Sequence, residues 1–297
     1  MGSSLARVAG AVVLATILAL LATGCRRKKA PPTVSPVVGE SAVLPRVAPP
    51  ESTARTRASA RTLRVGGRDR RYTLVEPTSL LPERRYPLIL VFHGDGGDGA
   101  SFHEQWPFEK ATGDEAILAY PDGVRRTWDL ETTKDNPDEL FVEAIVNEVA
   151  STRPIDRARL FATGYSSGGF LANILACHRP GYFRAIASNA GGAPFKQLET
   201  WSNGFPKCPG QKPVAMLALH GGADWSVTLD SGRFSAEYWA YVNGCALDQM
   251  ETTGYAECQV YRGCPTGLAV GWCSIPPLGH WVWDESAQAT WTFFQRQ

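Results

Sequence analysis

Several patterns typical of other protein classes are missing from this 297-residue sequence. It has no C-x-x-C pair and no His-x-x-x-His spacing, the usual ligand patterns of zinc sites, so we expect no metal and no other cofactor. It has no internal repeat, which argues against repeat architectures. The apolar run at residues 8–22 is too short to cross a membrane comfortably. The chain is long enough for one large domain or two small ones.

The same apolar run, preceded by Arg7, is typical of a secretory signal peptide. It leads into Ala22-Thr23-Gly24-Cys25, which is similar to a bacterial lipobox except that Ala22 stands at the usual leucine position. We expect residues 1–25 to be the signal segment and Cys25 to be lipidated, with simple cleavage and release as the alternative. The mature protein would then be extracellular or periplasmic, as an outer-membrane-anchored lipoprotein.

Residues 26–60 are rich in Pro, Ala, Ser, Thr and Arg and lack a periodic apolar pattern, which predicts a disordered linker. The net charge of +1 hides an asymmetry: residues 26–71 carry twelve Lys or Arg and three acids, whereas residues 72–297 carry seventeen and twenty-six. A basic tether beside a lipid anchor is expected to lie on an anionic membrane surface. Nucleic acid is not an expected partner because the remaining chain is acidic.

Six of the seven cysteines lie beyond residue 176, an even number that suggests three disulfides in an exported protein. Residues 257–261 and 269–275 each show the apolar–polar alternation of a strand, and the turn between them contains Gly and Pro. Cys258 and Cys273 are equally far from the centre of this predicted hairpin and are expected to face each other. The remaining pairs would be Cys245 with Cys264 and Cys177 with Cys208.

From residue 61 onward the chain alternates between strand-like and helix-like segments, which predicts an α/β fold with a mostly parallel sheet and helices on both faces. Continuous apolar runs typical of buried parallel strands occur at 86–92, 116–120 and 214–219, and a further buried strand is predicted at 185–189. Amphipathic spacing predicts helices at 137–151, 234–242 and 286–295. Two alternating segments around Gly66 and Gly67 predict an opening hairpin. We therefore expect one domain over residues 61–297.

The sequence Gly-Tyr-Ser-Ser-Gly at 164–168 lies between an apolar strand and a helix-like segment. In that context G-x-S-x-G describes a nucleophile elbow, a sharp turn that holds a serine clear of the backbone. A structural Gly/Ser turn is the alternative. Ser166 is the predicted nucleophile, and Gly164 and Gly168 would let strand and helix approach closely.

A serine hydroxyl needs a base, and histidine is the usual one near neutral pH. Of five histidines, His280 lies on a loop after the last predicted strand, where the chain order nucleophile, acid, base requires it. Asp224 lies between Ser166 and His280, just beyond the strand at 214–219, and is the predicted acid that orients the imidazole. His93 and His220 enter Gly-rich turns and are expected to hold the backbone.

An oxyanion hole needs two N–H groups aimed at the developing negative charge. Ser167, next to the nucleophile, is expected to supply one. The Gly-rich loop at 93–97 is expected to supply the other through Asp95, whose carboxylate must then point away from the oxyanion. A plain glycine-rich turn is the alternative reading of this loop.

These motifs together resemble the secreted polyhydroxybutyrate depolymerase-like and feruloyl esterase group, over about residues 61–297. The matching segments are 66–77 (GGRDRRYTLVEP), 87–97 (PLILVFHGDGG), 155–161, 164–169 (GYSSGG), 220–224 (HGGAD), 239, 243–245 (NGC) and 279–283 (GHWVW). The resemblance implies an α/β-hydrolase fold and a serine esterase of polymer esters or their fragments, with Ser166, Asp224 and His280 as its triad. Asp95 and the pair Cys258 and Cys273 differ from the pattern of this group, so the resemblance does not decide which ester is the substrate.

Nine tryptophans are many for this length, and Trp128, Trp225 and Trp281 fall in loops predicted near the site. Their rings could line an acyl pocket or stack on sugars, although packing in the core is the alternative for each. The other functions considered are a serine peptidase on the same fold, a catalytically silent polysaccharide-binding module and an acyltransferase.

Overall fold

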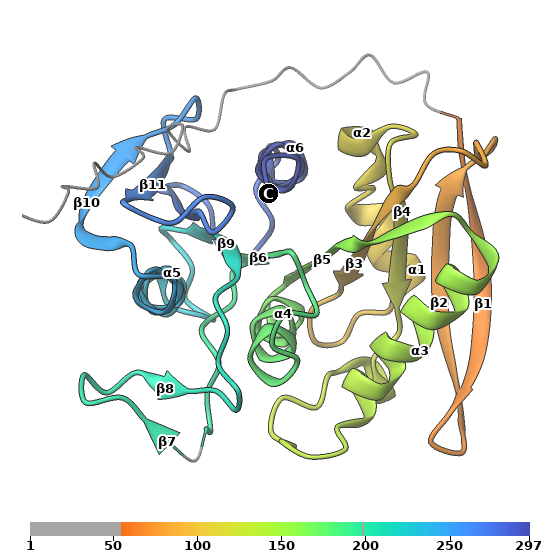
Figure 1. Cartoon of the computed structure of the whole chain (residues 1–297), viewed down its shortest axis with the longest axis horizontal. Coiled ribbons are helices and arrows are strands. Elements are labelled where there is room, and N and C mark those ends of the chain that lie inside the picture. The colour runs from red at the N-terminus through yellow and green to blue at the C-terminus, as the bar shows by residue number, and fades with distance from the viewer. Residues whose placement is uncertain (1–54, 198) are drawn as a thin grey trace, which may run out of the picture. The chain divides into compact units, whose positions relative to one another are not determined.

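The computed structural model describes residues 55–297 except residue 198. They form a ten-stranded mixed sheet in the order β1-β2-β4-β3-β5-β6-β9-β12-β11-β10, with a separate pair β7-β8 (Figure 1). The strands are β1 (Thr56–Val65), β2 (Arg68–Pro77), β3 (Tyr86–Phe92), β4 (Ile117–Pro121), β5 (Ile155–Tyr165), β6 (Ala185–Asn189), β7 (Glu199–Thr200), β8 (Pro206–Lys207), β9 (Ala215–Gly221), β10 (Ala246–Thr252), β11 (Cys258–Arg262) and β12 (Val270–Ile275). The helices are α1 (Gly99–Gln105), α2 (Glu109–Thr112), the 3₁₀ turn η1 (Val124–Arg126), α3 (Pro137–Thr152), α4 (Ser167–His178), α5 (Leu229–Asn243) and α6 (Ser286–Phe294).

The centre of the sheet is parallel and its two edges are antiparallel. Strands β4, β3, β5, β6, β9 and β12 run in one direction, whereas β1-β2 and β10-β11 add antiparallel pairs outside them. Every residue of β3 and β9 is buried, because parallel strands are covered on both faces. The predicted α/β fold with a mostly parallel sheet is confirmed.

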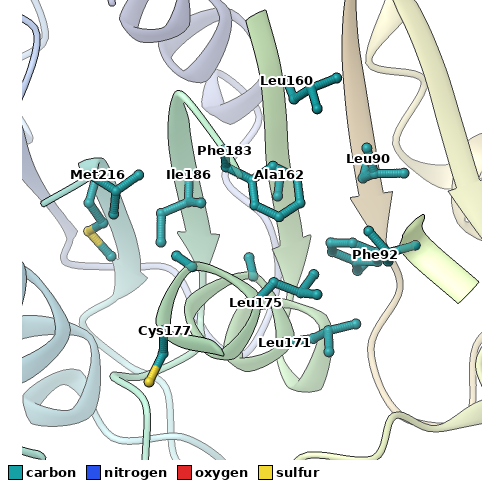
Figure 2. Close-up of a cluster of buried hydrophobic side chains, with 14 of the residues drawn as sticks. Leu90, Phe92, Leu160, Ala162, Leu171, Leu175, Cys177, Phe183, Ile186 and Met216 are labelled. Carbon is teal, nitrogen blue, oxygen red and sulfur yellow. The ribbon is translucent and has the colours of Figure 1, made fainter. Parts of the chain in front are cut away.

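Helices cover both faces of the sheet (Figure 1). Alternate residues of a strand point to opposite faces, so Leu90 and Phe92 pack in one core while Ile89 and Val91 pack in the other. Residues of α3, α4 and α5 join the first core, and residues of α1, α2 and α6 join the second. Figure 2 shows the first core where Leu171 and Leu175 of α4 face the strands.

The predicted opening hairpin is present but begins earlier than the composition suggested. Strand β1 starts at Thr56, so the prediction of a linker over 26–60 is wrong for residues 56–60. Every residue of β1 pairs with one of β2, and this pairing orders a polar segment that carries little apolar pattern of its own. Six of the twelve basic residues assigned to the basic segment therefore belong to the sheet. The rest of the predicted linker, the signal segment and Cys25 lie outside the described residues.

The structure contains three disulfides in the predicted pairings. Cys258 and Cys273 face each other across the β11-β12 hairpin with Cα atoms 4.0 Å apart. Cys245 pairs with Cys264 beside it, and Cys177 at the end of α4 pairs with Cys208 after β8. Disulfides form and persist in oxidising compartments, so this domain belongs outside a reducing cytoplasm. None of the helices in the described part of the chain is long and apolar enough to cross a membrane.

Candidate active site

Ser166 occupies the sharp turn between β5 and α4. Its φ of 54° and ψ of −120° are sparsely populated for a residue with a side chain, and its N–H is held by the Asn189 carbonyl oxygen at 2.9 Å. The turn is crowded, because a Cβ atom at Gly168 would lie 2.4 Å from the Phe92 carbonyl oxygen. Strand β3 and the start of α4 therefore need a glycine at this point, as the elbow motif predicts.

Two neighbouring strands carry the predicted acid and base. Asp224 follows β9 and His280 follows β12, which pairs with β9 in parallel. The loops at the carboxyl ends of these strands lie side by side and are joined by a hydrogen bond from Ala223 N–H to the Leu278 carbonyl oxygen at 2.9 Å. The sheet order thus brings together two residues that are 56 positions apart in the sequence.

The structure brings Ser166, His280 and Asp224 into one chain of hydrogen bonds. His280 Nε2 lies 2.9 Å from Ser166 Oγ, and His280 Nδ1 lies 2.7 Å from Asp224 Oδ2. If Nδ1 carries the proton and donates it to the carboxylate, Nε2 is free to accept the serine proton. The Asp224 side chain is buried, and the imidazole is 22% exposed, so a substrate can reach the base.

The Asp224 carboxylate is held by several donors at once. Its Oδ1 accepts hydrogen bonds from Ser226 N–H at 2.9 Å and Val227 N–H at 3.0 Å. Burial alone would raise the pKa of this carboxyl, but the hydrogen bonds from His280, Val227 and Ser226 outweigh it and hold the pKa below its usual value. Asp224 is therefore an anion at any pH at which an imidazole can act as a base.

The two predicted oxyanion donors belong to segments that adjoin the elbow. Ser167 begins α4, where the first N–H groups have no partner within the helix. Gly94, next to Asp95, packs on the elbow, because a Cβ atom there would lie 3.3 Å from Ser166 Cβ. The Asp95 carboxylate accepts a hydrogen bond from Thr127 Oγ1 at 2.5 Å. This contact binds the charged group to the neighbouring 123–128 loop.

The other four histidines have partners of their own. Buried His93 bonds Gly94 O and Gly123 N–H, and burial lowers its pKa, so it holds the backbone as predicted. His220 donates to the Val227 carbonyl oxygen at 2.8 Å, and burial lowers its pKa as well. His103 bonds Glu109 and His178 bonds Glu139.

The three predicted substrate-binding tryptophans have different surroundings. Trp225 is 93% exposed next to Asp224, and Trp281 is 39% exposed beside His280. Trp128 is only 5% exposed, and its Nε1 donates to the His93 carbonyl oxygen at 2.8 Å. The prediction that Trp128 contacts substrate is therefore wrong, because its ring packs on Phe92 and His93 and supports the loop that carries Asp95.

Three residues near the site were not singled out from the sequence. Asn173 of α4 accepts hydrogen bonds from Ser235 and Trp239 of α5 and so fixes the helix that follows the nucleophile. Thr127 holds Asp95, and Tyr165 contacts the base loop. A buried amide in an otherwise apolar helix could have indicated Asn173, but Thr127 carried no sequence signal. In residues 55–197 and 199–297 no group of three or more His, Cys, Asp or Glu is arranged to hold a metal ion.

The chain is similar to known proteins over most of its described length. A model of the prolyl oligopeptidase family matches residues 123–206. The chain is 30% identical over 242 residues to the Aspergillus niger protein named "Probable feruloyl esterase C", covering 76% of this chain and 83% of the relative. It is 31% identical over 182 residues to feruloyl esterase C of Emericella nidulans, covering 59% and 63%.

A solved structure shows the same fold. The acetyl xylan esterase from Aspergillus awamori superposes with a TM-score of 0.61 at 16% identity, over 80% of this chain and 99% of that one. At this identity the likeness shows the architecture alone, whereas the Aspergillus niger relative shares both length and sequence. The chain therefore belongs to the feruloyl esterase family of α/β-hydrolases, a family of serine hydrolases that act on carboxylic esters.

Proposed function

We propose that this protein is an exported serine esterase that cleaves carboxylic esters of polymers or their fragments, with feruloyl esters of polysaccharides as the preferred class. The observation that carries the proposal is the hydrogen-bond chain from Ser166 Oγ through His280 to Asp224. The names of the two relatives support the choice of a feruloyl ester.

In the first half-reaction Ser166 Oγ attacks the ester carbonyl carbon while His280 Nε2 takes its proton. Asp224 keeps the imidazole in the required tautomer and stabilises the imidazolium. The carbonyl oxygen becomes an oxyanion that accepts hydrogen bonds from the N–H groups of Ser167 and Asp95. His280 then gives its proton to the departing alcohol oxygen, the ester C–O bond breaks, and the acyl group remains on Ser166.

In the second half-reaction a water molecule replaces the alcohol. His280 takes one proton of that water as its oxygen attacks the acyl carbon, and the oxyanion forms again between the same two N–H groups. Collapse of this intermediate breaks the bond to Ser166 Oγ, which regains its proton from His280. The products are a carboxylic acid and the free enzyme, and no step calls for a metal or a redox group.

Two exposed aromatic rings beside the triad support a polymeric substrate. Trp225 adjoins the acid and Trp281 adjoins the base, and both leave ring surface open to solvent. Flat aromatic surfaces stack on sugar rings and on phenolic acyl groups. A short acyl ester has neither a sugar ring nor a phenolic group, so these exposed tryptophans favour a longer or aromatic substrate.

A panel of esters tests the proposal directly. Purified protein is assayed with feruloylated arabinoxylan oligosaccharides, acetylated xylan oligosaccharides and hydroxybutyrate oligomers. We expect the highest kcat/KM on the feruloyl esters. A higher value on either of the other two would move the assignment to that ester, and no hydrolysis of any of the three esters by the folded protein would contradict the proposal.

Peptide hydrolysis is a second candidate, favoured by the match of residues 123–206 to the prolyl oligopeptidase family. The triad chemistry is the same for amides, but an amine is a poorer leaving group than an alcohol and must be protonated before it departs. Aminoacyl-p-nitroanilides assayed beside p-nitrophenyl esters separate the two. Faster turnover of the anilides would favour the peptidase.

We also propose that the chain is exported and held at a membrane surface through a lipid on Cys25 and the basic segment after it. The three disulfides support export, and the lipobox-like sequence at 22–25 supports lipidation. Metabolic labelling with a palmitate analogue tests the anchor. Label is expected on the wild type and not on Cys25→Ala, which should be released in soluble form; an unlabelled wild type would contradict the anchor.

A further inference from the structure

Tyr165 is the last residue of β5, directly before the predicted nucleophile. Its hydroxyl donates a hydrogen bond to the main-chain oxygen of His280 at 2.7 Å. Its ring lies 5.1 Å from the His280 ring and 4.9 Å from the Trp281 ring, the latter edge to face. One side chain therefore binds the loop that carries the base by both a hydrogen bond and aromatic packing.

The other contacts of the Tyr165 ring include the loop at 93–97, which carries Asp95. A Cβ atom at Gly94 would lie 2.7 Å from Tyr165 Cδ1, so the Gly94 backbone passes directly against the ring. Phe102 of α1 stacks on the ring with centroids 6.3 Å apart. Tyr165 thus lies between the loop that carries Asp95 and the loop that carries His280, and it is covalently next to Ser166.

We infer that Tyr165 is a positioning residue that fixes the His280 loop against the nucleophile elbow through its phenolic hydroxyl. The inference rests on the proposed function, because it concerns the placement of the proposed base. The triad distances then depend on a side chain whose hydroxyl bonds the main chain of the base and not its imidazole. A small displacement of a reacting group can cost about a hundredfold in rate, so this hydrogen bond bears directly on kcat.

The hydroxyl is suited to this role at every working pH. Burial raises the pKa of Tyr165 to about 12, and the Asp224 charge adds to the rise. The phenol therefore stays neutral and keeps the proton that it donates to His280 O. Charged or titratable side chains near the phenol are Asp224 and His280, and neither removes that proton.

Tyr165→Phe tests the role because it removes one oxygen and keeps the ring. We expect kcat for a p-nitrophenyl ester to fall by about ten- to a hundredfold while KM changes less than about twofold. The rate of Ser166 labelling by a fluorophosphonate should fall by the same factor, since labelling also needs the base close to Oγ. A merely structural hydroxyl would lower the melting temperature without changing either rate at 25 °C.

Tyr238→Phe is the matched control. Tyr238 is a buried tyrosine of α5 whose hydroxyl lies 3.0 Å from Gln211 Oε1, away from the triad. Both variants lose one partly buried phenolic hydrogen bond, so similar losses of melting temperature are expected, but only Tyr165→Phe should lose kcat.

The outcomes separate the inference from the function on which it rests. A Tyr165→Phe protein that keeps wild-type kcat and labelling rate overturns the inference and leaves the esterase proposal intact. A folded wild type that neither labels nor hydrolyses esters overturns both. A loss of kcat that Tyr238→Phe reproduces equally would assign the effect to stability and also overturn the inference.

Discussion

The triad side chains are held by hydrogen bonds and a strained turn, whereas the neighbouring Trp225 side chain is exposed to solvent. Asp224 accepts three hydrogen bonds, His280 bonds on both ring nitrogens, and Ser166 is fixed by a strained turn. Trp225, one residue beyond Asp224, is 93% exposed. Within two adjacent positions the chain passes from a buried carboxylate to a ring surrounded by solvent.

This contrast teaches which part of the site the fold determines. The reacting groups lie at the ends of neighbouring strands, where the sheet and the hydrogen bonds between loops leave them little freedom. The Trp225 ring lies on the outer surface of the loop that carries Asp224, where a different side chain would disturb nothing in the core. Changes to the first set should therefore act on kcat, and changes to Trp225 should act on KM.

Replacement of the nucleophile should have the largest effect. Ser166→Ala removes the attacking oxygen, and we expect kcat on a p-nitrophenyl ester to fall by roughly a millionfold. Circular dichroism checks that the variant is folded, and a fluorophosphonate should label the wild type and not the variant. Residual activity near that of the wild type would show that Ser166 is not the nucleophile, and a wild type that does not react with the probe would favour the silent binding module.

Replacement of the acid should cost less. Asp224→Asn keeps the shape but can stabilise the wrong imidazole tautomer and no longer balances the imidazolium charge, so kcat should fall by about a thousand- to ten-thousandfold with KM little changed. Steady-state kinetics on purified variant measure both. A change in KM alone would show that Asp224 binds substrate and does not support the base.

Acidification should remove activity without unfolding the protein. A protonated imidazole cannot accept the serine proton, so kcat/KM should fall more than about tenfold from pH 8 to pH 5. The pKa of Asp224 is lowered by folding, so its stabilising contribution is present above the unfolded value of about 3.9 and is lost only as pH falls through the lower folded value.

The fold should therefore persist at pH 5. Circular dichroism at pH 5 and full recovery of activity on return to pH 8 check this expectation. A flat rate profile over this interval would contradict a histidine base, and a loss of activity that tracks unfolding would assign the effect to stability.

Removal of the exposed ring should give a smaller effect of a different kind. Trp225→Ala is expected to raise KM on a feruloylated oligosaccharide by about tenfold, to leave kcat unchanged and to have no effect on a small p-nitrophenyl ester. Leu247→Ala on β10, whose side chain is also exposed, is the matched control and should change neither constant. Equal effects on large and small substrates would show that Trp225 supports the triad.

The smallest effect is expected at Asp95. Asp95→Asn keeps an acceptor for Thr127 and removes a negative charge beside the proposed oxyanion, so kcat should rise by about two- to fivefold at low salt and less at high salt. A tenfold loss would show instead that the carboxylate itself takes part in the reaction. Kinetics at two salt concentrations distinguish these results.

Prediction from sequence succeeded where the local pattern and the tertiary environment agree. The runs at 86–92 and 214–219, which became β3 and most of β9, are apolar throughout because both of their faces are covered, and this can be recognised without a structure. The equal spacing of Cys258 and Cys273 from one turn likewise predicted their pairing. The chain order of Ser166, Asp224 and His280 selected residues that the structure brings within hydrogen-bonding distance.

Prediction failed where a partner distant in sequence decides the outcome. Strand β1 is polar and reads as a linker, but it is ordered by hydrogen bonds to β2 along its whole length. Trp128 and Trp225 are both loop tryptophans, and nothing in their sequence neighbourhoods shows that one packs on Phe92 and the other lies in solvent. The role inferred for Tyr165 depends on a residue 115 positions away.

The sequence by itself determined the class of fold, the elbow, the order of the proposed triad and the pairing of Cys258 with Cys273, because these depend on periodicity, on local motifs and on the order of those motifs along the chain. Only the tertiary structure decided which rings face solvent, where the sheet begins and what holds the His280 loop in place. These properties depend on contacts between segments that are distant in sequence, and burial and hydrogen-bond geometry exist only once the strands are side by side.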